Sequence, residues 1–169
     1  MISWDKFDIT PYTAAPERMK ATIPFEGMTG EEVFEVVGDP NKITEWFLLA
    51  KEVRIHPMEE GEDPTFDVVF TFFGEIYEEV LFWDPPHRYV YLAQGPDFPI
   101  KDYIGRIEVE ETGPREGIMR WSFHYDIVEG EEFRRIIPVM LPPVIEASLR
   151  RLVPLIRGTA FEFEDRMGG

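Results

Sequence analysis

The sequence predicts an α+β domain, in which helices are separated along the chain from an antiparallel sheet. Apolar and polar residues alternate with a period of two in several segments between residues 51 and 127, as expected for strands with one buried face. Apolar residues recur every three or four positions before this region, at 29–47, and after it, at 131–157. Helical segments on both sides of a run of strands favour α+β over an alternating α/β order.

Composition limits the class of protein. A length of 169 residues suits one domain with a substantial core, and 14 Phe, 6 Tyr and 4 Trp make it rich in aromatic side chains. The net charge of −16 argues against nucleic-acid partners and anionic membrane surfaces, which would repel it. The absence of cysteine excludes disulfides and thiolate chemistry. With no signal peptide and no apolar run of transmembrane length, we expect a cytoplasmic protein without membrane insertion.

The chain divides into a polar lead-in at 1–18, a single domain at 19–158 and a short polar tail at 159–169. The segment KATIPF at 20–25 reads as the first strand. The polar, proline-bearing lead-in is expected to lie against the domain in an ordered or half-ordered form.

Two short helices should follow the first strand. Thr29 and Glu32 have the spacing of a capping box ahead of an apolar run. Asp39 and Pro40 begin a second segment, NKITEWF, where Asp39 can cap and Pro40 fits the first turn. Trp46 and Phe47 end this second helix and lie on its apolar side.

The alternating region predicts six further strands. Between them, Gly74 and the prolines of WDPPHR interrupt the pattern, because proline cannot donate to a strand ladder. With the first strand, these make a sheet of about six to seven strands. Their expected ranges are 51–56, 65–73, 75–83, 88–94, 103–111 and 118–127.

The long C-terminal helix is predicted at 131–157, with its main segment beginning at Pro143. Pro138, Pro142 and Pro143 are expected to break its approach, and Pro154 to bend its body, since proline removes a helical hydrogen bond and crowds the preceding turn. The apolar residues that share one face, and should face the sheet, are Leu141, Ile145, Leu149 and Leu152.

The chain resembles the START-like (SRPBCC) superfamily, and within it the polyketide cyclase/dehydrase-type branch. The matching segments are VFEVVGDPNKITEWF at 33–47, EEVLFWDPPHRYVY at 78–91, RWSFHY at 120–125 and the C-terminal helix. The resemblance implies a helix-grip fold, in which a curved sheet wraps the last helix and encloses an apolar pocket. Members of the superfamily bind lipids, sterols, polyketides or plant hormones, and some cyclise or dehydrate a bound chain. Fold alone does not choose among these activities.

Strand parity gives a set of pocket-lining residues, because alternate side chains point to opposite faces. From the sheet we expect Phe66, Phe70, Phe72, Tyr103, Trp121, Phe123 and Tyr125. From the helices we expect Trp46, Leu141, Ile145, Leu149 and Leu152. Aromatic rings with a few hydroxyls suit a mostly hydrocarbon ligand that carries some oxygens.

Glu79 and Tyr77 are the candidate catalytic residues. If Gly74 and Glu75 form a two-residue turn, both side chains face inward. A carboxyl on an apolar face must be paired, protonated or functional, so Glu79 could act as a general acid or base with a raised pKa. In the alternative, a turn one residue longer sends Glu79 to solvent.

Three functions stay open. The first is binding of a small hydrophobic or aromatic ligand, which requires a cavity of several hundred Å3, as is usual for ligand sites (roughly 300–1,000 Å3). The second is a polyketide cyclase or dehydratase acting in the same pocket, and the third is a protein-interaction domain with a filled core. The three histidines read as surface or turn residues without metal-ligand spacing, so we expect no metal and no cofactor, in a monomer or homodimer.

Overall fold

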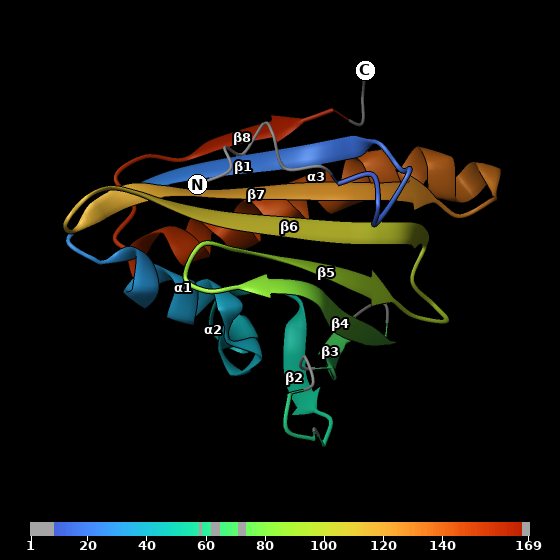
Figure 1. Cartoon of the computed structure of the whole chain (residues 1–169). Helices are drawn as coiled ribbons and strands as arrows, with labels where there is room; N and C mark the ends of the chain where they lie inside the picture. Colours follow the sequence, from blue (N-terminus) through green and yellow to red (C-terminus); the bar gives the residue numbers. More distant parts are fainter. Residues whose placement is uncertain (1–8, 58, 62–64, 71–73, 167–169) are drawn as a thin grey trace.

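The computed structural model describes residues 9–57, 59–61, 65–70 and 74–166. Its central element is one curved antiparallel sheet in the order β2-β3-β4-β5-β6-β7-β1-β8 (Figure 1). The strands are β1 (Glu17–Glu26), β2 (Ala50–Ile55), β3 (Thr65–Phe70), β4 (Gly74–Asp84), β5 (Arg88–Gln94), β6 (Ile100–Gly113), β7 (Glu116–Ile127) and β8 (Glu162–Asp165). Eight strands exceed the expected six to seven, because β8 forms within the predicted tail and pairs with β1.

The short helices lie where the capping residues predict them. In α1 (Gly30–Gly38), Thr29 Oγ1 accepts from the Glu32 amide at 3.1 Å and the Glu32 carboxylate accepts from the Thr29 amide at 3.2 Å. The second segment splits into a 3-10 turn, η2 (Pro40–Lys42), and one turn of α-helix, α2 (Ile43–Trp46). The Asp39 side chain accepts from the Asn41 amide at 3.0 Å, as its capping role requires.

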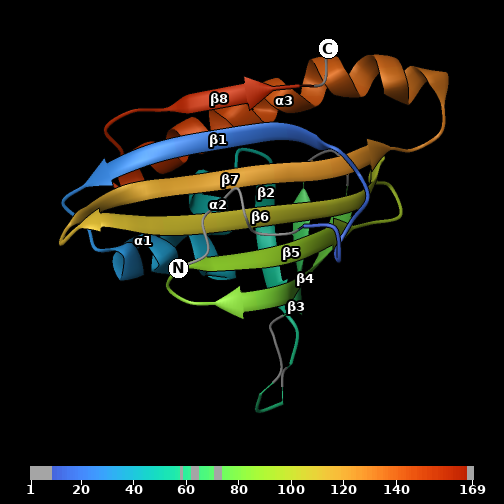
Figure 2. The ribbon, with the colours of Figure 1, turned by 45° about the horizontal axis from the view of Figure 1, so that its top comes forward.

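The C-terminal helix α3 (Glu131–Leu155) is continuous over 25 residues, about 37 Å. The expected break at Pro138, Pro142 and Pro143 was wrong, since all three lie inside the helix. Figures 1 and 2 show α3 running along the sheet beside β1 and β7. Burial of one helix face outweighs the local cost of the prolines, as tertiary packing commonly does for helices.

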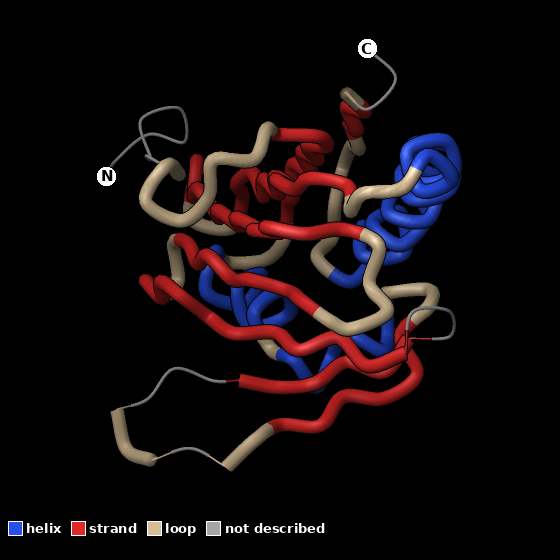
Figure 3. Tube along the Cα trace, turned by 90° about the vertical axis from the view of Figure 1, so that its right-hand side faces the viewer, coloured by secondary structure: helices blue, strands red, loops and turns tan. Residues whose placement is uncertain are grey.

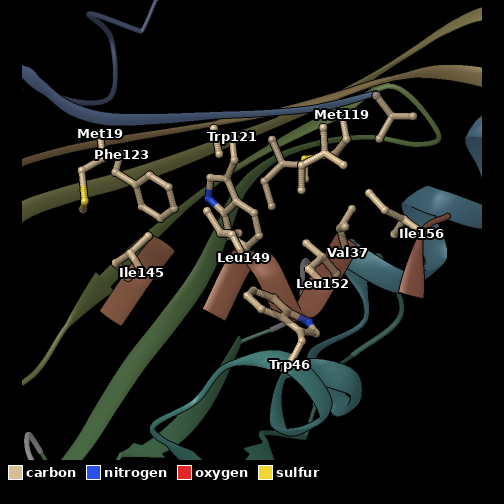
Figure 4. Packing of buried hydrophobic residues seen from close by; sticks show 14 of the residues in the cluster. Met19, Val37, Trp46, Met119, Trp121, Phe123, Ile145, Leu149, Leu152 and Ile156 are labelled. Atoms are coloured by element: carbon tan, nitrogen blue, oxygen red, sulfur yellow. The ribbon is translucent and has the colours of Figure 1, made fainter. Parts of the chain in front are cut away.

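The sheet curves around the helices, as Figure 3 shows from the side. In Figure 4, Trp121 and Phe123 point from β7 toward Ile145 and Leu149 of α3, and Trp46 approaches from α2. All five side chains belong to one buried apolar cluster. The sheet, the long helix and the two short helical segments therefore enclose a common interior, which is the helix-grip arrangement.

The pairing of β3 with β4 differs from the predicted register. The pairs run from Thr65 with Glu79 and Phe66 with Glu78 at one end to Phe70 with Gly74 at the other. Residues 71–73, which include the predicted Phe72, lie outside the described residues. A two-residue turn at Gly74 and Glu75 would instead have paired Phe70 with Glu79. Because Gly74 and Glu79 are an odd number of residues apart, the two faces of β4 are exchanged.

The outer face of β7 is another departure from expectation. His124, predicted as a surface residue, is only 6% exposed, and Ser122 is fully buried. Residues just before β1 cover this face, where the Ala15 carbonyl lies 3.4 Å from His124 Nδ1. Burial lowers the pKa of His124. Part of the lead-in therefore packs on the domain.

Candidate functional site

A cavity lies between the sheet and the helices. The space that the centre of a water molecule can occupy inside it is about 100 Å3. This is smaller than the expected several hundred Å3, yet it has room for more than one water-sized group, each of which needs about 10–15 Å3 by this measure. Its described lining is mostly apolar and includes no Lys, Arg or His. The aromatic lining residues are Trp46, Phe47, Phe66, Phe70, Tyr89, Tyr91, Phe98, Tyr103, Trp121 and Phe123.

Small residues on the inner face of the sheet make room for this cavity. Phe66, Glu78, Ala93 and Tyr103 form one row across β3, β4, β5 and β6, through successive strand pairs. Ala93 separates Glu78 from Tyr103 with only a methyl group. The side chains on either side of it therefore border open space.

Gly105 has a similar effect in the next row, where it pairs with Tyr91. A Cβ at this position would lie 2.2–2.4 Å from ring atoms and the hydroxyl of Tyr91. The Tyr91 ring therefore lies over the glycine backbone. This placement carries its hydroxyl toward Trp121 and Tyr103.

A hydrogen-bonded chain of side chains results. Trp121 Nε1 donates to the Tyr91 hydroxyl at 3.1 Å, and the hydroxyls of Tyr91 and Tyr103 are 3.0 Å apart. Burial raises the pKa of both tyrosines well above its usual value, so both stay protonated at neutral pH. We refer to Trp121, Tyr91 and Tyr103 as the hydroxyl relay.

Besides Asp39, which caps the Asn41 amide, Glu78 is the carboxyl group of this site. It lines the cavity, and within the described ranges no hydrogen bond or ion pair engages its carboxyl oxygens. Burial raises its pKa to about 8, so the neutral acid predominates at pH 7. The charge of ionised Glu78 would raise the pKa of Tyr91 and Tyr103 further, which reflects how near the three groups lie.

Trp46 offers one more polar group. Its side chain is buried and lines the cavity, and its indole packs edge-on against Trp121 at 5.3 Å between centroids. Its Nε1 has no hydrogen-bond partner among the residues that the structure describes. A buried donor without an acceptor costs free energy, on the order of 1–3 kcal/mol.

The structure brings most of the predicted lining residues together. Those that border the cavity are Trp46, Phe66, Phe70, Tyr103, Trp121, Phe123, Leu141, Ile145 and Leu149. Tyr125 and Leu152 do not border it and are fully buried in the surrounding core. Tyr125 stacks on Tyr103 at 6.2 Å instead.

Tyr77 and Glu79 do not face the cavity, so the predicted inward orientation is wrong and the alternative, with Glu79 outward, holds. They lie on the outer face of β4, where the Tyr77 hydroxyl donates to Glu79 Oε2 at 3.3 Å. The His56 ring stacks on Tyr77 and bridges Thr65 at 3.0 Å and Asp67 at 2.9 Å. The reason is the β3–β4 register, which turns Glu78 inward in place of Glu79.

Sequence reasoning missed Glu78, Tyr89 and Tyr91. Tyr89 also lines the cavity, and its hydroxyl donates to the Val37 carbonyl at 2.6 Å. The alternation in RYVYLAQ could have placed Tyr89 and Tyr91 on one face. No comparable signal identified Glu78, because its face depends on the hairpin register.

The described residues hold no group of three or more His, Asp or Glu side chains placed to bind a metal ion. Among the described helices, none combines the length and the apolar character that a membrane crossing requires.

Comparisons with known proteins agree with this architecture. The model of the family described as "Polyketide cyclase / dehydrase and lipid transport" matches residues 16–157. No curated protein matches the chain in sequence.

Solved structures give the same answer at the level of the fold. An aromatase/cyclase, Zhui, from a Streptomyces species has a TM-score of 0.69 at 12% identity, over 83% of this chain and 94% of its own. The protein XoxI from Bacillus cereus has a TM-score of 0.63 at 18% identity, over 82% and 95%. A START superfamily protein from Mycobacterium smegmatis has a TM-score of 0.62 at 13% identity, over 82% and 97%.

Proposed function

Because the chain belongs to the polyketide cyclase/dehydrase and lipid transport family, within the START-like superfamily, we propose that its cavity binds a small hydrophobic or aromatic ligand. The observation that carries the proposal is the cavity itself, an internal space lined by aromatic and aliphatic side chains from both the sheet and α3. Such concave apolar sites with few polar groups are the usual form of ligand pockets. A domain with a filled core, the third possibility, would lack this space.

Binding can be measured by intrinsic fluorescence, since Trp46 and Trp121 line the cavity. We expect the bicyclic hydrocarbon tetralin to change their emission saturably. Ala93→Leu adds three carbons within the cavity and should weaken this binding at least tenfold, whereas Glu79→Gln on the outer face should not. Equal tetralin binding by both variants would contradict the proposal. Native mass spectrometry of the purified protein would look for a co-purified natural ligand.

Glu78 favours a second candidate function, a cyclase or dehydratase acting in the same cavity. An acid with a pKa of about 8 is close to neutrality, where proton transfer in both directions is most effective. Glu78, rather than the predicted Glu79, would then exchange protons with a bound ketone. Deuterium exchange at carbon 2 of 1-tetralone in D2O tests this: catalysis should be lost in Glu78→Gln and kept in Glu79→Gln.

A further inference from the structure

The cavity has hydrogen-bond donors to spare: Trp46 Nε1 has no partner among the described residues, and the hydroxyl relay holds one proton too many. In the hydroxyl relay, Tyr91 and Tyr103 together carry two hydroxyl protons, and only one of them can lie between the two oxygens. Trp121 supplies its own proton to Tyr91. Whichever tyrosine donates to the other, one hydroxyl proton of the pair is left over for a further acceptor.

Glu78 faces the same space as this spare proton. Glu78 and Tyr103 occupy one cross-strand row, on either side of Ala93. Two strand spacings separate their backbones by about 10 Å, and both side chains border the cavity. The methyl group of Ala93 leaves the space between them open.

The structure also argues against a charged ligand group. The described lining contains no cationic side chain that could compensate a carboxylate or phosphate, and an uncompensated charge is costly in an apolar site. Next to the hydroxyl relay, an ammonium group would need Glu78 to be ionised, because the other lining carboxyl, that of Asp39, lies at the start of η2 and accepts from the Asn41 amide. Burial opposes that ionisation, and it is the only cause of the raised pKa of this residue.

We infer that the ligand presents a neutral oxygen acceptor, such as a ketone carbonyl, to two donors: Glu78 as an un-ionised carboxylic acid and the spare hydroxyl of the Tyr91–Tyr103 pair. This inference rests on the proposed binding function and specifies the chemistry of the ligand. Two donors can share one carbonyl oxygen, which has two lone pairs. The same pair of donors would stabilise negative charge on that oxygen if the ketone enolises.

Three bicyclic probes of nearly equal size test the inference: 1-tetralone, tetralin and 1-aminotetralin. The wild-type protein should bind the ketone about tenfold more tightly than the hydrocarbon at pH 6–7, as expected for one to two net hydrogen bonds. The preference should decline above pH 8, where Glu78 ionises and loses its proton. Glu78→Gln keeps an N–H donor, so it should keep the preference and lose this pH dependence.

The variants separate the two donors. Glu78→Leu should reduce the ratio of ketone affinity to hydrocarbon affinity several-fold. A single Tyr103→Phe leaves the Tyr91 hydroxyl proton available, so only the Tyr91→Phe/Tyr103→Phe double variant should remove the hydroxyl donor. That variant also frees the Trp121 N–H, which donates to Tyr91 in the wild type. Glu79→Gln serves as the matched control, because it removes the neighbouring carboxyl from the opposite face.

The outcomes distinguish this inference from the proposed function. If ketone and hydrocarbon bind equally well, the inference is overturned and the binding function stands. If the amine binds best and tightens as the pH rises, Glu78 acts as an ionised acceptor and the inference is likewise overturned. If none of the three probes binds, the binding function fails and the inference with it.

Discussion

Glu78 and Glu79 are adjacent in β4, yet their side chains lie on opposite faces of the sheet. Glu78 lines the cavity, while Glu79 accepts a hydrogen bond from Tyr77 on the outer face. Two carboxyls of identical chemistry thus occupy an interior and a surface environment one residue apart. Glu79→Gln is therefore a matched control for substitutions of Glu78.

The first prediction concerns stability and pH. The pKa of Glu78 is raised from 4.5 to about 8 on folding, so between these values the unfolded state releases a proton that the folded state keeps. The contribution of Glu78 to the free energy of unfolding is therefore fully present below about pH 4.5. It is lost as the pH rises to 8, at up to ~1.4 kcal/mol per pH unit. Glu78→Gln should remove this loss and exceed the wild type in stability at pH 8.

Urea denaturation of both proteins from pH 5 to 9 measures this difference. Glu79→Gln should show no comparable gain relative to the wild type as the pH rises. If the free energies of unfolding of Glu78→Gln and the wild type differ by the same amount at every pH in this range, Glu78 does not titrate in the way that its burial requires.

A second prediction follows from the contact between Tyr91 and Gly105. Gly105→Ala places a methyl group where the Tyr91 ring lies, so the ring must move and the hydroxyl relay should break. Overpacking of this kind costs about 1–3 kcal/mol. In a Tyr91→Ala background the same substitution should cost much less, and a double-mutant cycle by chemical denaturation measures the coupling. Additive effects would contradict the observed contact.

The third prediction contrasts the two sides of α3. Leu152 is fully buried and Val139 is 75% exposed. Leu152→Ala should therefore lower the free energy of unfolding by about 2–5 kcal/mol, and Val139→Ala should change it by less than about 0.5 kcal/mol. Thermal unfolding monitored by circular dichroism gives both values, and similar losses for the two variants would refute this orientation of the helix.

The sequence predicted the features that depend on local chemistry or simple periodicity. The capping box at Thr29 and Glu32 is confirmed because its hydrogen bonds lie within one turn. The inward face of β7 is also confirmed, as Trp121 and Phe123 line the cavity. These predictions required no knowledge of which strand lies opposite.

What sequence reasoning missed depends on contacts between distant segments. The inward carboxyl was assigned to Glu79 because the β3–β4 register was taken from an assumed turn, and an odd offset exchanges the faces. The prolines of α3 were read by local propensity, but the packing of the helix on the sheet prevails. His124 was placed at the surface because parity cannot show that residues before β1 cover that face.

The most direct test of the account is the titration of Glu78 itself, followed by the 13C chemical shift of its side-chain carboxyl, with Glu78→Gln to assign the resonance. A carboxyl that faces an apolar cavity without a charged partner should titrate near pH 8. A midpoint at about pH 4.3, the usual value for a solvated glutamate, would mean that Glu78 is not the buried acid of the cavity.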